Sequence, residues 1–188
     1  MVKIDNDLLE TLKRIHEDFK LIDRKDIVVD NWVRWKCFFG CRAFGKYLNC
    51  PPFIFSVEDT KKFLECYEKA IIVHFEVDSD SETPPEDLHK FLVEKAKISC
   101  EKMLEFEKKA FYFGYYKAFA LYPLSCGYCS VCNAENELKI CENREKIRPS
   151  VEAVGIDVFQ TARNAGYKIN VLNTSKAKVA LYGILMLE

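Results

Sequence analysis

The chain has 188 residues, of which 49% are hydrophobic, and this is enough for one domain with its own core. Its 28 basic and 29 acidic side chains almost balance, so the net charge of −1 gives no reason to expect a nucleic acid as partner. No segment approaches the roughly 18 apolar residues of a membrane span, and the acidic N-terminus is unlike a secretory signal. We therefore expect a cytoplasmic protein with a single domain over residues 1–188.

The first predicted elements are a helix at 6–20, where leucines recur at helical spacing, and a short strand at 27–29. Residues 37–52 combine cysteines with glycines and prolines, and this composition predicts a loop. Ser56 is a candidate N-cap for a helix that reaches about residue 67, because Glu58 and Asp59 would lie in its first turn.

The middle of the chain predicts a βαβ unit. The segment 70–77 is rich in β-branched residues and predicts a strand. A Thr-Pro-Pro run at 83–85 would open a long helix, and residues 117–124 predict a second strand. The connection would be right-handed if the two strands are parallel.

The last predicted elements are a helix that Ser150 would cap and that would end before Gly166, followed by a hairpin of 167–172 with 178–187. Together the elements predict an α/β fold, with α+β as the alternative. A mixed sheet would have flanking helices and would carry two cysteine loops, at 37–52 and 126–148.

Nine cysteines are a high count for this length. The odd number and the lack of a secretory signal argue against a disulfide framework. In a reducing compartment, grouped cysteines more often bind metal, and seven of the nine fall in the two loops.

The second loop has the spacing C-x2-C-x2-C-x8-C. Proteins commonly bind zinc with two separate C-x2-C pairs, whereas this loop has three cysteines in succession and a fourth alone. A four-iron (4Fe-4S) cluster needs one thiolate at each iron, and a chain that wraps around it can supply a thiolate at every third residue. The spacing favours a 4Fe-4S cluster, with zinc as the alternative, on Cys126, Cys129, Cys132 and Cys141.

Two further features of this loop fit a cluster. Gly127 would allow the backbone to approach the cluster closely. The basic residues that follow could offset the cluster's negative charge, although a solvated basic face explains them equally well. These residues are Lys139, Arg144, Lys146 and Arg148.

The first loop holds Cys37, Cys41 and Cys50 at the spacing C-x3-C-x8-C, and two prolines follow the third cysteine. A cysteine before proline also ends the bacterial ferredoxin run. Three thiols predict either a second 4Fe-4S cluster with one open iron or a cluster completed by a distant residue such as Cys66 or Cys100. Zinc, ordinary loop thiols, or one larger cluster on all seven cysteines are the alternatives.

Cys66 and Cys100 occur in helical patterns beside apolar residues. A free buried cysteine behaves as a small hydrophobic residue, so we expect both to be structural.

Several motifs lie in fixed order between residue 37 and about residue 166. They are the two cysteine patterns, Asn-Cys-Pro-Pro at 49–52, Arg-Pro-Ser-Val-Glu-Ala at 148–153 and Gly-Ile-Asp-Val at 155–158. With them the chain resembles an uncharacterised prokaryotic family of predicted metal-binding proteins, a domain of unknown function. The resemblance implies metal binding, most plausibly by iron and sulfur, and no established reaction.

Arg148 and Glu152 are weak catalytic candidates because they follow the second loop directly. Arg148 could bind an anion or a cluster sulfur, and Glu152 could donate a proton beside an open iron. The alternative is structural, with Glu152 in a first helical turn and with Ser150 and Asp157 as caps.

Three functions remain open on the sequence alone. The first is electron transfer through two 4Fe-4S clusters to a redox partner protein. Aromatic residues would shield the clusters from water, namely Phe38, Phe39, Tyr47 and Tyr128. The second is a small iron-sulfur enzyme, a reductase or sulfur-transfer catalyst, that holds a small-molecule substrate at an open iron. The third is a structural zinc-binding protein.

Overall fold

The computed structural model describes residues 4–78, 88–170 and 178–188. Its α-helices and strands alternate irregularly along the chain, and two short 3-10 helices occur at Arg24–Asp26 and Asn133–Glu135. In chain order the main elements are α1 (Asn6–Ile15), β1 (Phe19–Asp23), α2 (Asn31–Gly40), α3 (Val57–Leu64), β2 (Lys69–Asp78), α4 (Leu88–Tyr112), β3 (Phe119–Leu121), α5 (Val158–Asn164) and β4 (Lys178–Met186).

The four strands form one sheet in the order β1-β2-β4-β3, and every neighbouring pair is antiparallel. Since β2 and β3 both pair with β4, they run in the same direction, and α4 joins them as a crossover with β4 between them. The predicted combination of sheet and flanking helices is confirmed, and the antiparallel pairing makes the fold α+β.

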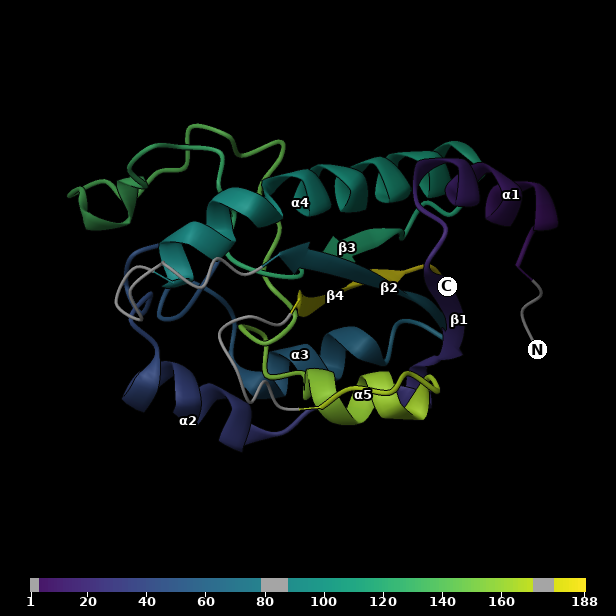
Figure 1. Cartoon of the computed structure of the whole chain (residues 1–188), viewed down its shortest axis with the longest axis horizontal. Coiled ribbons are helices and arrows are strands. Elements are labelled where there is room, and N and C mark those ends of the chain that lie inside the picture. Colours follow the sequence, from purple (N-terminus) through teal and green to yellow (C-terminus); the bar gives the residue numbers. More distant parts are fainter. Residues whose placement is uncertain (1–3, 79–87, 171–177) are drawn as a thin grey trace.

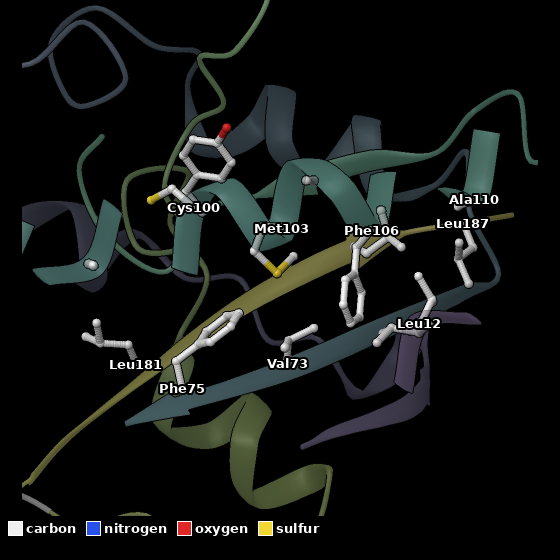
Figure 2. Close-up of a cluster of buried hydrophobic side chains, with 14 of the residues drawn as sticks. Leu12, Val73, Phe75, Cys100, Met103, Phe106, Ala110, Leu181 and Leu187 are labelled. Carbon is white, nitrogen blue, oxygen red and sulfur yellow. The ribbon is translucent and has the colours of Figure 1, made fainter. Parts of the chain in front are cut away.

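The sheet lies between two layers of helices (Figure 1). α1 and α4 cover one face, and α3 and α5 cover the other. Under α4, Met103 and Phe106 pack against Val73 and Phe75 of β2 and Leu181 of β4 (Figure 2). Burial of each such side chain contributes about 1.5–3 kcal/mol. The opposite face has its own core, so the sheet is a buried platform.

Several predicted boundaries change. The first helix ends at Ile15, and Phe19 belongs to β1, where it is paired with Val73. The helical spacing of the apolar residues had included Phe19, but this half-buried side chain packs against the core from the sheet. Residues 27–29 form no strand, and only Val29 makes an isolated bridge, to Ile156.

The prediction of a loop from residue 37 is wrong at its start. α2 extends to Gly40, and Asp30 caps it by accepting a hydrogen bond from the Trp32 backbone N–H. The helix was hidden because its large aromatic residues are exposed, so no apolar stripe marks it. Trp35 is 67% exposed and Phe39 is 87% exposed.

Of the other predicted elements, some are confirmed and others are shorter than predicted or not formed. Ser56 caps α3 as expected, and Gly166 follows α5 with a positive φ of 77°. The strand predicted at 117–124 is shorter, with an isolated bridge between Tyr122 and Ser150 beyond it. Of the predicted hairpin only β4 is present, because residues 167–170 form no strand and 171–172 lie outside the described residues. Among the described helices, none has both the length and the apolar character of a membrane span.

Gly155 holds the start of α2 in place, and replacing it by alanine should destabilise the protein. Its φ is +89°, and an added Cβ would lie 2.8 Å from Val57 Cγ2. Its carbonyl accepts a hydrogen bond from the Asp30 N–H, at 2.9 Å. We expect Gly155→Ala to lower the free energy of unfolding by about 2–4 kcal/mol, measured by anaerobic urea denaturation.

Gly40→Ala is the matched control, because nothing lies within 4 Å of a Cβ added there. Its denaturation midpoint should stay close to that of the parent. A second variant, Val57→Ala with Gly155→Ala, should recover only the steric part of the loss. An unchanged midpoint for Gly155→Ala alone would contradict the prediction.

Candidate metal centre

The two cysteine loops meet at one end of the molecule. In Figure 1, residues 41–56 and the segment that follows β3 both lie beyond the first turns of α4. Cys50 Sγ is 3.1 Å from Ser125 Oγ, within hydrogen-bond distance. The Ser150 backbone N–H donates to the Asn49 carbonyl. The chain segments at 49–50, 125–126 and 148–150 therefore form one contact region.

Asn49 is the hydrogen-bonded centre of this region. It is 1% exposed. Its Nδ2 donates to the Arg148 carbonyl at 3.0 Å, and its Oδ1 accepts from the Cys126 backbone N–H at 3.3 Å. Cys50 Sγ lies 3.8 Å from the same Oδ1. One buried amide thus ties the first cysteine loop to both ends of the second.

The first thiol group consists of Cys37 in the last turn of α2, Cys41 just after it, and Cys50. The pKa of Cys50 is raised to about 11, mainly by burial and in smaller part by the thiols of Cys37 and Cys41. Hydrogen bonds from Ser125 and Ser150 act in the opposite direction. Burial and the neighbouring Cys41 likewise raise the pKa of Cys37.

Arg34 supplies a cation beside this group. Its Nη1 donates to the Phe55 carbonyl at 2.8 Å. Its Nε is buried and has no hydrogen-bond partner among the described residues. Burial lowers the pKa of Arg34, while the nearby Cys37 and Cys50 raise it. An unpaired buried N–H is costly, so this position is suited to an anionic acceptor.

The second thiol group consists of Cys126, Cys129, Cys132 and Cys141. The pKa of Cys126 is raised to about 12, mainly by burial and in smaller part by Cys132, Cys141 and Cys50. Burial also raises the pKa of Cys141, with further contributions from Cys129 and Cys132. The second group adjoins the first through Asn49, which is covalently bonded to Cys50 and accepts a hydrogen bond from the Cys126 N–H.

Asn143 donates hydrogen bonds to two of these sulfurs. Its backbone N–H donates to Cys141 Sγ at 3.3 Å, and its Nδ2 donates to Cys129 Sγ at 3.1 Å. Donors of this kind stabilise thiolates and tune the potential of metal sites. The sequence reasoning gave no role to Asn143 or Arg34 and quoted Asn49 only within a motif. Their roles depend on partners at least 14 positions away, which no local pattern reveals.

The start of the second loop packs against α4. A Cβ at Gly127 would lie 3.0 Å from the Val93 carbonyl. The small residue is therefore required by the helix, a reason that the sequence reading did not consider. Tyr128 Oη lies 3.1 Å from Tyr122 Oη, and the buried Tyr122 hydroxyl also donates to the Lys146 carbonyl. These contacts fix the loop to the core.

All nine cysteines are free thiols. Within residues 4–78, 88–170 and 178–188, no three Cys, His, Asp or Glu side chains converge closely enough to hold a single metal ion. The raised pKa values of Cys37, Cys50, Cys126 and Cys141 favour protonated thiols in the metal-free protein, so metal binding there would release protons.

Arg148 is already engaged. Its Nε donates to Glu107 Oε2 at 2.8 Å, its Nη2 donates to the other carboxylate oxygen, and its Nη1 donates to the Ile147 carbonyl. The bond to Glu107 raises the pKa of Arg148. These contacts favour the structural interpretation of Arg148 over a catalytic one, because a bidentate pair with a carboxylate occupies the guanidinium.

Glu152 lies close enough to Cys37 to raise the pKa of that thiol. Its side chain is exposed by accessible surface, yet many protein atoms surround its carboxyl, and this crowding raises its own pKa. Asp157 caps α5 by accepting from the Gln160 N–H at 2.9 Å, as predicted. Ser150 accepts from the Ala153 N–H in a turn, where no regular helix follows.

Of the remaining predictions for individual side chains, some are confirmed and others are wrong. Cys100 belongs to α4 and is fully buried, as expected. Cys66 lies just after α3 and is exposed, so the predicted burial of Cys66 is wrong. The Phe39 side chain is 87% exposed and therefore cannot shield a cluster from water. Phe38 is half exposed and packs on Phe44, with 4.9 Å between ring centroids.

Comparison with known proteins gives one family. The model of the family described as "Predicted metal-binding protein (DUF2284)" matches residues 20–187. No curated protein and no solved structure matches the chain. The match covers both thiol groups and all of the sheet except Phe19, the first residue of β1. It does not include α1.

Proposed function

Because this chain belongs to the DUF2284 family of predicted metal-binding proteins, we propose that its two thiol groups bind two 4Fe-4S clusters and that the protein transfers electrons. The observation that carries the proposal is the contact between the two loops that hold seven free cysteines, where the Cys126 N–H donates to Asn49 and Cys50 Sγ lies 3.1 Å from Ser125 Oγ. Cys126, Cys129, Cys132 and Cys141 would hold one cluster, and Cys37, Cys41 and Cys50 would hold the other.

The donor set supports iron and sulfur. All seven candidate ligands are thiols, and thiolates select soft metals and iron-sulfur clusters. Arg34 brings a positive charge and an unpaired N–H to the first group. Asn143 brings two N–H donors to sulfurs of the second. Such residues favour a bound anion, and a four-iron cluster with thiolate ligands is one.

When bound, 4Fe-4S clusters supply one-electron redox chemistry. The protein's own residues would hold them close together and limit water. Cys50 and Cys126 are both buried, and Asn49 joins them through one covalent bond and one hydrogen bond. This short connection between the two groups is the basis for proposing electron transfer from one to the other. A redox partner protein is expected and has still to be identified.

A small iron-sulfur enzyme is the second candidate, and one observation favours it. The first group has three thiols rather than four, and the Glu152 carboxyl lies near Cys37. This arrangement would leave one iron for a reductase or sulfur-transfer substrate, with Glu152 positioned to hold a proton there. A structural zinc protein is the third candidate, because thiolates also bind zinc.

Metal and sulfide analysis of anaerobically purified protein tests these proposals together. Two 4Fe-4S clusters predict about eight irons and about eight acid-labile sulfides per chain, with electron paramagnetic resonance signals after reduction. Colourless protein with stoichiometric zinc and no labile sulfide would overturn both iron-based functions. About four irons per chain would restrict the proposal to one cluster.

A further inference from the structure

A cavity of about 660 Å³ lies beside the two cysteine loops and involves none of their seven cysteines. Its walls come from α3, from β3 and from the segments 48–55 and 147–149, which include Asn49 and Arg148 of the contact region. Its size falls in the range of about 300–1,000 Å³ that is typical of small-molecule sites. A cavity of this volume can enclose a ligand of several rings.

The walls are mainly apolar and aromatic. Phe53 and Phe55 follow the first cysteine loop, Phe63 belongs to α3, and Phe119 belongs to β3. Phe63 and Phe119 meet edge to face, with 5.5 Å between ring centroids. Aromatic walls of this kind favour a ligand with rings, because stacked and edge-to-face contacts add to the burial of apolar area.

Two arginines contact the wall of the cavity, at the Phe55 backbone and at the Phe119 ring. Arg34 donates to the Phe55 carbonyl, and Arg148 stacks over Phe119 at 5.5 Å. Both residues belong to the scaffold of the cysteine loops, so the cavity and the loops share their supports. The cavity is thus a formed part of the fold rather than a gap between loose segments.

The charges at the cavity favour an anion. Asp59 keeps its negative charge, because the hydrogen bonds from the Ser56 hydroxyl and N–H and the nearby Lys62 all lower its pKa. Arg148 is paired with Glu107. Two further cations lie at the edge, the exposed Lys62 in the lining and Lys139, whose amine lies 5.3 Å from the Phe53 ring centroid. The formal balance of these five side chains is two negative against three positive.

We propose that this cavity binds a small organic molecule with an apolar ring system and a single negative charge. The rings would lie among the four phenylalanines, and the charged group would lie at the edge near Lys62. The proposal goes beyond iron binding and does not rest on it, because none of the seven cysteines proposed as cluster ligands lines the cavity.

Two fluorescent probes with related ring systems test the proposal. Anilinonaphthalene sulfonate carries a sulfonate, and N-phenylnaphthylamine is neutral. We expect both to bind the purified holoprotein saturably with one site per chain. Lys62→Gln should weaken the sulfonate by about two- to fivefold, as for an exposed ion pair, and should leave the neutral probe unchanged.

Cys66→Trp tests the location, because Cys66 is exposed and lines the cavity. The indole should fill the cavity and weaken both probes at least about tenfold. Glu65→Trp is the matched control, since the neighbouring exposed residue does not line the cavity, and it should bind as the parent does. Leu48→Trp provides a second filling variant if Cys66→Trp fails to fold by circular dichroism.

Absence of saturable binding, or unchanged binding in folded filling variants, would overturn the site. Equal effects of Lys62→Gln on both probes would overturn the preference for an anion. Iron content, measured on the same samples, should be the same in the parent and in the Lys62, Glu65 and Cys66 variants, which lie outside both cysteine loops. Failure of the cavity proposal is therefore distinguishable from failure of the iron-sulfur proposal.

Discussion

Replacing Cys129 by serine is expected to remove about half of the bound iron, from about eight to about four per chain, and to leave the other half in place. Cys129 belongs to the second group, where Asn143 donates to its sulfur, and the first group has its own supports in Arg34 and Ser125. Iron and sulfide analysis with electron paramagnetic resonance should show one signal lost and one retained.

Cys66→Ser is the control for this experiment, because Cys66 is an exposed cysteine outside both loops. It should keep all of the iron. Complete loss of iron in Cys129→Ser, with the helix content unchanged by circular dichroism, would mean that the seven thiols share one site. Full retention of iron would remove Cys129 from the set of ligands.

The second large effect is expected for Asn49→Leu. The substitution keeps the approximate volume of a side chain that is 1% exposed. It leaves the Cys126 N–H and the Arg148 carbonyl without their partner. Each unsatisfied buried group costs about 1–3 kcal/mol, so the free energy of unfolding should fall by about 3 kcal/mol. Iron content should fall as well, because the two loops lose their common support.

Asn164→Leu is the matched control, since its exposed amide makes a single long-range hydrogen bond, to the Asp26 carbonyl. It should change the stability by less than about 1 kcal/mol. Asn49→Asp should also destabilise the protein, because a carboxylate cannot donate to the Arg148 carbonyl. Normal urea midpoints and normal iron content in both Asn49 variants would show that the two loops are held together in another way.

Local patterns predicted the features whose causes are local. Ser56 and Asp157 mark helix starts because each cap acts within three residues. The strand at 70–77 was identified because its β-branched residues are consecutive, and β2 extends it by only one residue at each end. The cysteine spacing identified both loops for the same reason, since the grouping of ligands is visible in the sequence.

Features that depend on distant partners could not be predicted in this way. Asn49 acts through partners 77 and 99 residues away. α2 was missed because it presents aromatic residues to solvent, so its pattern is not that of an amphipathic helix. Phe19 fitted a helical spacing and was drawn into β1 by pairing with β2, 54 positions further along the chain.

The order of the strands has a consequence for how the protein is made. β4 lies in the middle of the sheet, yet both cysteine loops precede it in the chain. On the ribosome, the cysteines of both loops emerge while the sheet still lacks the strand that joins β2 to β3. Such late, non-local pairing slows folding. We therefore expect the seven cysteines to emerge before their platform exists, and any cofactor to be assembled only after β4 has been made.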